Sequence, residues 1–289
     1  MVDQHGQIDI RSIDIQRIAM AYSEEASIFK SFVQIQKTSA REIRWQSKTA
    51  GILTATSPAV TSNVASGAQP FILASTWTRT TSYVRKYFVE SEIIPEEDIK
   101  DNQVNLLLDS LRDLVIHIEN DVDTRIWNVL TEDQTAVNIS TNATTAAWDA
   151  GSGQDIVEDI EEALENIRTN TKEKVVNPIL FLNPHDYKSM ITWLISTKGS
   201  SIPNFSSQIA QDGVVDMFLS CRIVVSNNVT TDYALLAVPD KACIWYEFTP
   251  LTTAQIEEKG IGTKLRVWEE GEAILVRPKF CNLITNTKA

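Results

Sequence analysis

The side chains that could carry out chemistry are few, and they are scattered along the sequence. Neither the histidines nor the cysteines have the spacing of a metal site: His5, His117, His185, Cys221, Cys243 and Cys281. No G-x-S-x-G or P-loop pattern occurs. The short glycine pairs around Ser152 and Ile261 are typical of turns. The sequence therefore predicts no catalytic centre, metal or cofactor, and we expect a protein that is not an enzyme.

Carboxylates do cluster, in the pairs Glu161–Glu162, Glu257–Glu258 and Glu269–Glu270. Paired carboxylates can perform acid–base work or bind a hard cation. Neighbouring residues on a strand point to opposite faces, however, so Glu269 and Glu270 are not expected to line one pocket. We expect these pairs to form solvated faces or ion pairs between subunits.

Aromatic and basic side chains gather on two strand-like stretches, 28–53 and 71–94, which are separated by a Ser/Thr/Ala/Gly-rich tract at 54–69. The second stretch is rich in strand-forming residues, yet polar and basic residues occupy both faces of its pleat. A strand buried in its own domain shows one apolar face, and an isolated hairpin is marginal in water. We therefore expect a long hairpin that projects from its domain and is completed by a neighbouring copy.

Two tryptophans, Trp45 and Trp77, lie on opposite arms of this expected hairpin. They can contact a neighbouring subunit or pair across the strands, and the two roles are compatible. The candidate contacts between subunits are these tryptophans and the basic residues of the second arm, with the acids after Pro95 as possible partners: Trp45, Trp77, Arg79, Arg85, Lys86, Glu96, Glu97 and Asp98.

Length and charge limit the class of protein. The chain has 289 residues, enough for one large domain or two ordinary ones. A net charge of -12 argues against a basic surface for nucleic acid. No apolar run approaches the roughly 20 residues of a membrane helix, and the N-terminus lacks signal-peptide character. The three separated cysteines are expected to be small buried thiols in a reducing cytoplasm.

Helix signals are strongest between residues 104 and 130, where apolar residues recur at steps of three and four. This pattern predicts an amphipathic helix roughly 40–50 Å long that starts after Pro95, with Asp109, Asp113, Asn120 and Asp123 on its polar side. Residues 8–27 are expected to form a short helix or an arm that orders only on a partner. A second helix is predicted over 154–170, and a further helix begins at Pro184 with Asn183 as its cap.

Strands are predicted mainly in the second half of the chain. Their expected ranges are 175–182, 222–226, 233–238, 242–248, 263–268 and 273–277. Pro239-Asp240 and Glu270-Gly271 are interpreted as turns, and 131–154 as a loop or small hairpin. Helices and strands are interspersed without regular βαβ alternation, which favours an α+β fold.

This order of segments resembles the major capsid protein family of tailed bacteriophages, whose fold is shared with encapsulin nanocompartment shells. Residues 107–130 look like that family's spine helix, and 176–184 resemble the strand–helix step of its axial domain. The tail from Leu265 to Phe280, which includes Arg277-Pro278, is similar to the family's closing strands. The resemblance extends over nearly the whole chain.

The resemblance implies an N-terminal arm (1–27), an extended β-hairpin loop (28–94), a peripheral domain (95–147 and 252–289) and an axial domain (148–251). It implies a structural subunit that self-assembles as pentamers and hexamers into an icosahedral virion capsid around viral double-stranded DNA, in the host cytoplasm. Portal and cement proteins are possible partners, with a separate scaffold or none. Sequence-specific DNA binding and membrane association are not expected.

Two other interpretations stay open. One is an encapsulin-like nanocompartment shell, which would bind a short cargo tail along its inner wall. The other is a soluble enzyme or adhesin with a hairpin insertion, although the absence of a convergent His, Cys or Ser constellation argues against an enzyme.

Overall fold

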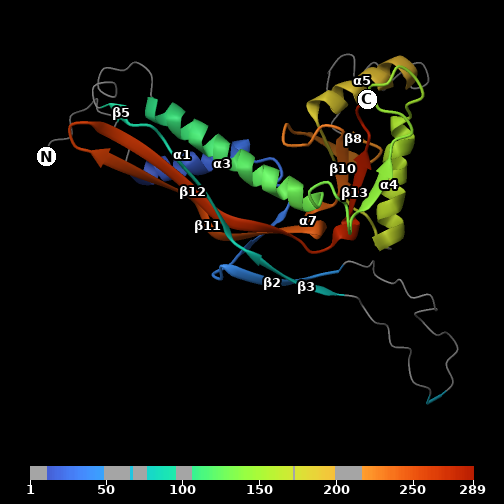
Figure 1. Cartoon of the computed structure of the whole chain (residues 1–289), viewed down its shortest axis with the longest axis horizontal. Coiled ribbons are helices and arrows are strands. Elements are labelled where there is room, and N and C mark those ends of the chain that lie inside the picture. The colour runs from blue at the N-terminus through green and yellow to red at the C-terminus, as the bar shows by residue number, and fades with distance from the viewer. Residues whose placement is uncertain (1–11, 49–65, 68–76, 96–105, 172, 199–216) are drawn as a thin grey trace.

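The computed structural model describes residues 12–48, 66–67, 77–95, 106–171, 173–198 and 217–289 (Figure 1). The three acids expected at the start of the long helix, Glu96, Glu97 and Asp98, lie outside these ranges, as does most of the tract 54–69.

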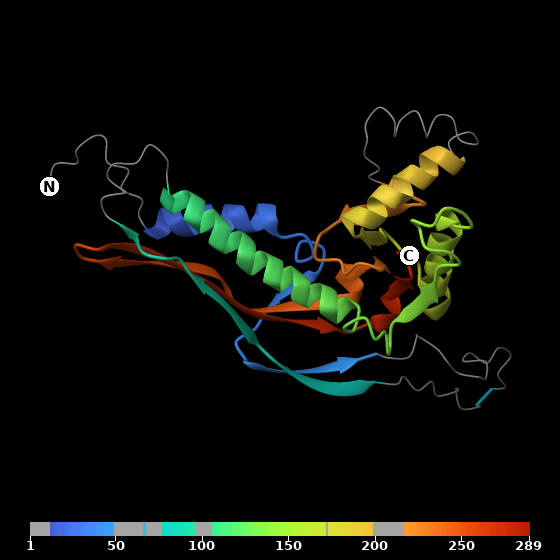
Figure 2. The same cartoon turned by 45° about the horizontal axis from the view of Figure 1, so that its top comes forward.

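The long helix is α3, Leu106–Leu130, which extends about 38 Å at 1.5 Å per residue. The shorter helix α1, Ser12–Ala26, lies along it (Figure 2). Both confirm predicted helices within the described residues. The prediction for one polar residue was wrong, because Asp123 lies on the buried side of α3 and is fully buried. Its carboxylate accepts backbone hydrogen bonds there, which replace water.

A five-stranded sheet lies against these helices. Its path is β1 (Gln34–Lys37), β11 (Cys243–Glu258), β12 (Gly262–Leu275) and β4 (Arg85–Glu90), and β5 (Ile94–Pro95) also pairs with β12. Strands β11 and β12 form one long antiparallel hairpin, whereas β1 runs parallel to β11. The hairpin turns at Gly260, whose φ of +77° suits a glycine.

The turn predicted at Glu270-Gly271 was wrong, because both residues lie inside the continuous strand β12. Gly271 is needed for close packing instead of for a turn. A Cβ atom at this position would lie 2.3 Å from Cζ2 of Trp245 on the neighbouring strand. The indole ring therefore occupies the space that a side chain would fill.

A second sheet, of six strands, forms the other half of the molecule. Its order is β6 (Ser140–Ala143), β13 (Cys281–Thr285), β10 (Tyr233–Ala237), β7 (Ile179–Leu182), β9 (Cys221–Val225) and β8 (Met217–Phe218). The tract predicted as a loop or small hairpin contributes β6, which pairs in parallel with β13. The predicted turn at Pro239-Asp240 opens the short helix α7, Pro239–Ala242, and η2 (Pro278–Phe280) precedes β13.

Two helices pack near this second sheet, α4 (Ile156–Thr171) and α5 (Pro184–Trp193), and α5 continues into the π-helical turn η1 (Leu194–Lys198). The predicted cap of α5 is confirmed. The Asn183 side chain accepts a hydrogen bond from the backbone N–H of His185 at 3.0 Å, and Pro184 occupies the first turn.

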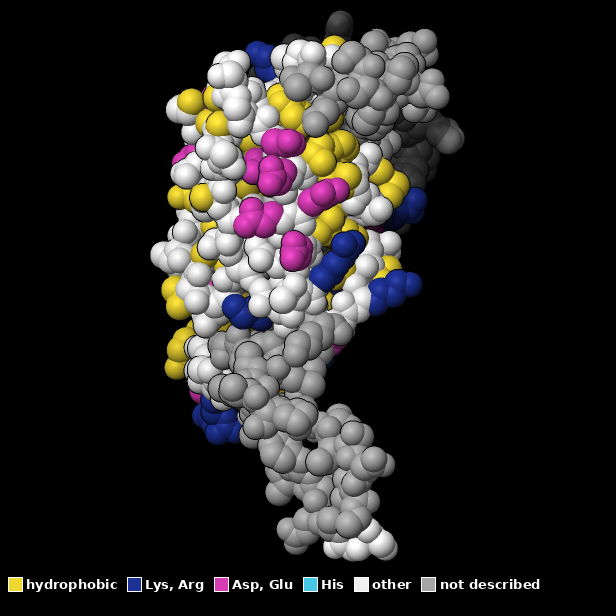
Figure 3. All heavy atoms as spheres, turned by 90° about the vertical axis from the view of Figure 1, so that its right-hand side faces the viewer, with side chains coloured by type: hydrophobic (Ala, Val, Ile, Leu, Met, Phe, Trp, Pro, Cys, Tyr) yellow, Lys and Arg dark blue, Asp and Glu magenta, His cyan; other side chains and the backbone are white. Residues whose placement is uncertain are grey.

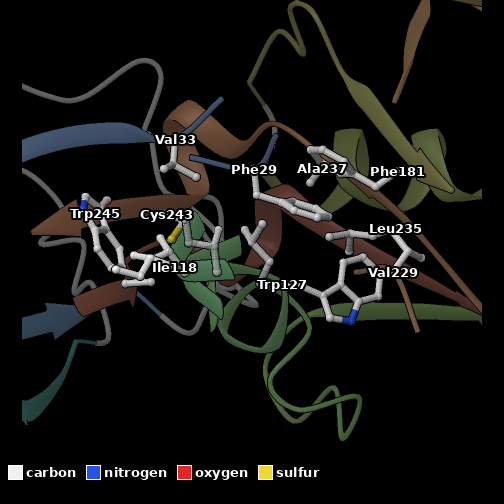
Figure 4. Close-up of a cluster of buried hydrophobic side chains, with 14 of the residues drawn as sticks. Phe29, Val33, Ile118, Trp127, Phe181, Val229, Leu235, Ala237, Cys243 and Trp245 are labelled. Carbon is white, nitrogen blue, oxygen red and sulfur yellow. The ribbon is translucent and has the colours of Figure 1, made fainter. Parts of the chain in front are cut away.

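Two hydrophobic cores meet at the second sheet. The larger core packs α1 and α3 against the first sheet and reaches Phe181 and Leu235, as Figure 4 shows. The other core packs α4 and α5 against Leu180 and Leu236. Adjacent residues of β7 and β10 therefore point into different cores, as a strand period of two requires.

The three cysteines are buried free thiols, as predicted. Burial raises the pKa of Cys221 to about 11 and that of Cys243 to about 12, so both are neutral near pH 7. Within the described residues, none of the helices is long and apolar enough to span a bilayer.

Candidate functional site: the limb and its charged base

A small two-stranded sheet stands apart from the two large ones. We call it the limb: β2 (Glu42–Ser47) paired antiparallel with β3 (Thr78–Tyr83). It lies below the long β11–β12 hairpin in the views of Figures 1 and 2. On β2 only Ile43 and Ser47 are buried, and no residue of β3 is buried.

The limb occupies less of the segment 28–94 than the sequence predicts. Phe29 and Val33 are buried in the larger core, and residues 34–37 form β1. Residues 85–90 form β4, which pairs with β12. The body of the protein therefore holds both ends of the segment, because its apolar residues at these ends are buried against α3 and the first sheet.

The predicted contact residues of the limb divide into two kinds. Trp45 is half-buried, and its Nε1–H donates a hydrogen bond to Ser82 Oγ at 2.9 Å, so it pairs across the strands. Trp77 is 50% exposed, with the Lys48 ammonium group 5.7 Å from its ring centroid. Arg79 is exposed and forms no ion pair with any residue that the structure describes.

Arg85 and Lys86, expected to pair with acids of other subunits, have partners within their own chain. Arg85 Nε lies 3.0 Å from a carboxylate oxygen of Glu272, and Lys86 Nζ lies 3.8 Å from one of Glu270. Their side chains remain 57% and 54% exposed. These contacts bind β4 to β12 directly after the limb ends.

The acids of β12 are buried, so the expectation of a solvated face or inter-subunit pairs was wrong for them. Glu270 also pairs with Arg41, which precedes β2, at 3.3 Å, and Glu272 pairs with Arg125 of α3. Four cations from three separate segments thus neutralise two carboxylates that lie two positions apart on β12. They bind both chain segments at the base of the limb to a single strand.

A second charged cluster lies between α3 and β12. Lys30 Nζ is 2.7 Å from Glu269 and 3.5 Å from Glu119, and Ser23 of α1 donates a hydrogen bond to Glu119. Burial, together with the charge of Glu119, raises the pKa of Glu269 to about 7 even though Lys30 opposes the shift. Glu269 and Glu270 contact different partners, which agrees with the prediction that they face opposite ways.

Asp123 joins the turn after α1 to α3. Its carboxylate accepts backbone hydrogen bonds from Ile28, Phe29 and Lys30 at 2.7, 3.0 and 3.1 Å. Burial raises the pKa of Asp123 to about 6, although these hydrogen bonds favour the ionised form. Sequence reasoning missed Lys30, Glu119 and Asp123 as partners, because a lone charge beside an apolar stripe does not reveal a contact about 90 positions away.

The limb and its charged base are suited to a mechanical task. A projecting element is held at its base by ion pairs to β12, while α1 and its turn are held to α3.

The exposed face of α4 carries a row of acids, Glu158, Glu161, Glu162 and Glu165, and Figure 3 shows acidic side chains gathered on that side of the molecule.

In a comparison with protein families, the chain matches the phage capsid protein family over residues 79–279. This range includes nearly all of β3, all of α3, and both large sheets except for β1 and β13. No curated protein matches the chain.

Solved structures of shell proteins share the fold. A capsid protein of the cyanophage P-SCSP1u aligns with a TM-score of 0.66 at 15% identity, over 90% of this chain and 88% of that one. A chain from Mycobacterium phage Che8 aligns with a TM-score of 0.60 at 17% identity, over 91% and 92%.

A virus-like particle from Pyrococcus furiosus aligns with a TM-score of 0.64 at 9% identity, over 94% of this chain and 98% of that one. The fold by itself is therefore shared by phage capsids and by this virus-like particle, whereas the family match favours the phage capsid. The chain belongs to the phage capsid protein family, has the α+β fold of tailed-phage major capsid proteins, and is a structural subunit of a capsid shell.

Proposed function

We propose that the limb lies against a neighbouring copy and that this contact closes the shell. The observation that carries the proposal is the exposure of β3, which has no buried residue and, among the described strands, pairs with β2 alone. Trp77, directly before β3, and Tyr83, at its end, are 50% and 68% exposed. Large aromatic side chains on a projecting sheet are typical of surfaces that a partner covers.

The product is an icosahedral virion capsid of pentamers and hexamers that forms in the host cytoplasm and encloses double-stranded DNA. A net charge of -12 suits a wall that does not bind the genome tightly. Scaffolding, portal and cement proteins are further partners. The division into arm (1–27), extended loop (28–94), peripheral domain (95–147 and 252–289) and axial domain (148–251) belongs to the same proposal.

The contact residues follow from the exposed part of the limb. The side chains of Trp77 and Arg79 are available to a neighbour. Those of Arg85 and Lys86 are already paired within the chain, so only their exposed surface can contact a neighbour. Trp45 supports the limb from within through its bond to Ser82. Glu96, Glu97 and Asp98 remain proposed acidic partners in the neighbouring copy.

Replacement of residues 42–83, which include both strands of the limb, by a short Gly/Ser linker tests the role of the limb. We expect the shortened chain to fold, with unchanged circular dichroism of its helices, but to form no closed particles in negative-stain micrographs. The substitution Trp77→Ser should raise the critical concentration for assembly about tenfold, because a buried aromatic anchor contributes 1–2 kcal/mol. Val137→Ser is the matched control, since Val137 is 77% exposed away from the limb. Normal closed particles from the shortened chain would refute the proposal.

The encapsulin-like alternative is favoured by one observation, the fold shared with the Pyrococcus furiosus particle. The ratio of absorbance at 260 and 280 nm in purified particles separates the two functions. A nucleic-acid spectrum supports the virion capsid, and a protein spectrum with a co-purifying enzyme supports the nanocompartment.

A further inference from the structure

A buried amine and two buried carboxyl groups meet in the charged cluster between α3 and β12. Lys30 Nζ lies 2.7 Å from Oε1 of Glu269 and 3.5 Å from Oε1 of Glu119. Both carboxyl side chains are fully buried, and the lysine side chain is 10% exposed. Three segments far apart in the sequence therefore hold one amine against two acids in a place that water hardly reaches.

The charges of this cluster do not balance. One ammonium group faces two carboxyl groups, and Glu247 of β11 adds the charge of a third acid. Among the described residues, no hydrogen-bond donor reaches Oε2 of Glu119 or Oε2 of Glu269. A bare buried carboxylate oxygen is costly, so the cluster favours a proton on one of its acids. Burial raises the pKa of Glu269 to about 7, so much of the protein carries this side chain as a neutral acid near neutral pH.

A neutral carboxyl group beside an amine is an electrophile beside a nucleophile. Because a carbonyl C–O bond is about 1.2 Å long, Nζ of Lys30 lies within about 4 Å of the carboxyl carbon of Glu269. Groups held in this way react as if at an effective concentration of about 10⁵ M or more. The exclusion of bulk water favours the release of water from the pair and protects an amide from hydrolysis.

We propose that Lys30 and Glu269 condense within one chain to form an isopeptide bond between Nζ and the carboxyl carbon. Glu119 accepts a proton from the ammonium group, and the neutral amine attacks the carboxyl carbon of protonated Glu269. The N–C bond forms and the C–O bond of the hydroxyl group breaks, while a proton from Glu119 completes the water that leaves. The second proton that the nitrogen loses stays on Glu119, so the three groups end uncharged and no other reactant is needed. Each chain reacts once, with itself, which is not enzymatic turnover.

The state of Lys30 sets the pace of this reaction. Burial lowers the pKa of Lys30, but the charges of Glu269 and Glu119 outweigh burial and raise the pKa above its ordinary value. The neutral amine is therefore the rarer form, and we expect condensation over days instead of minutes. Freshly purified protein is then mostly uncondensed, and in this form Glu269 still titrates with pH.

The bond joins residues 239 positions apart and fixes the turn after α1 to β12. Strand β12 also holds the base of the limb through Glu270 and Glu272. One strand would then hold the limb by ion pairs and the N-terminal helix by a covalent bond. The inference goes beyond the proposed function and does not depend on it, because the bond forms inside a single chain whether or not shells assemble.

The mass of the unmodified chain tests the proposal. Protein kept warm at neutral pH should accumulate a form that is lighter by the mass of one water molecule. Protease digests of this form should contain a branched peptide that joins the segments around Lys30 and Glu269. Denaturing electrophoresis should show single chains throughout, because the bond joins no copies. A chain that keeps its full mass would overturn the proposal, as would a loss of water that maps elsewhere, such as a cyclic imide at an aspartate.

Two variants separate the roles of the groups. Lys30→Arg keeps a positive charge but removes the amine, so the branched peptide should disappear. Glu119→Gln leaves the contact between Lys30 and Glu269 but removes the proton acceptor, and condensation should slow by at least about tenfold. An unchanged rate in Glu119→Gln would contradict the proton transfer. The digest of the unmodified chain decides the proposal even where a variant does not fold.

The chain also contains its own controls. Lys264 lies 3.1 Å from Glu258, and Lys241 lies 3.4 Å from Glu173, with 25–39% of these side chains exposed. Water solvates these carboxylates, so neither pair should give a branched peptide. Branched peptides from these exposed pairs at the same rate would show that contact alone is sufficient, and would overturn the role assigned to the buried cluster.

Discussion

At the scale of single residues, Gly271 shows how closely the first sheet is packed. The Trp245 ring occupies the place of a side chain at this position, and the ring itself is fully buried. We expect Gly271→Ala to lower the free energy of unfolding by about 1–3 kcal/mol, because the indole must move within a packed core. Thermal melting should show the shift. Gly151→Ala is the control, since a Cβ atom there meets nothing within 4 Å. Equal melting temperatures for the two variants would contradict the packing argument.

Glu269 is the residue through which pH should act on the fold. Its pKa is raised from 4.5 to about 7 in the folded protein, chiefly by burial. Between these two pKa values the folded state keeps a proton that the unfolded state releases. The contribution of Glu269 to the free energy of unfolding is therefore fully present below pH 4.5 and is lost as the pH rises through 7. Glu119 of α3, Glu247 of β11 and Lys30 face this carboxyl group and set the size of the effect.

We expect the free energy of unfolding to fall by up to about 3 kcal/mol between pH 4.5 and pH 7.5, at 1.36 kcal/mol per pKa unit. Urea titrations across this range measure the slope. Glu269→Gln should reduce the slope, because the amide carries no charge at any pH, and Asp123, whose pKa is also raised, supplies part of what remains. Glu257→Gln, at an exposed position of β11, should leave the slope unchanged. An unchanged slope in Glu269→Gln would assign the pH dependence to other groups.

At the scale of elements, the turn after α1 depends on α3 through one side chain. Asp123 accepts the hydrogen bonds of three successive backbone N–H groups, and all three lie at or next to the larger core. Asp123→Ala leaves these donors without a partner, at a cost of about 1–3 kcal/mol for each donor that water does not reach.

Hydrogen exchange measures this effect locally. In Asp123→Ala the amides of residues 28–30 should exchange at least about tenfold faster, while those of β7 and β10 keep their protection. Asp113→Ala, on the exposed side of α3, should change neither group. Faster exchange throughout the chain in Asp123→Ala would mean that the contact stabilises the whole fold instead of one junction.

The elements that sequence reasoning predicted well are those with a local signal. Helices α3 and α4 carry apolar residues at steps of three and four, and the cap at Asn183 is a pattern of two residues. Strand β12 has the opposite character. Its Glu-Glu-Gly-Glu run is typical of a turn, and only cations from four distant segments and the Trp245 ring make it a buried strand.

The limb lies between these extremes. Its polar residues on both faces predicted a projecting hairpin, and β2 and β3 have that character. Its length could not be predicted from local patterns. Residues 28–37 and 85–90 could either extend the hairpin or pair with the body, and the outcome depends on partners more than 150 positions away. For the same reason Arg85 and Lys86 could not be separated from Arg79 by composition alone.

At the scale of the whole molecule, the two cores are joined by shared strands. In β10, Leu235 and Ala237 point into the larger core, and Ala234 and Leu236 point into the other. Strand β7 divides its residues in the same way. Neither core can lose its packing without disturbing a strand on which the other depends, which argues for cooperative unfolding even though the sequence suggests two domains.

Two adjacent substitutions in β10 test this coupling. Leu235→Ala removes a fully buried side chain from the larger core and Leu236→Ala removes one from the other. Each should lower the free energy of unfolding by about 2–5 kcal/mol, the usual cost of such a cavity. If the cores unfold together, calorimetry shows a single transition that both variants shift to lower temperature. Two transitions, each shifted by only one of the variants, would show instead that the two cores unfold separately and that the shared sheet couples them weakly.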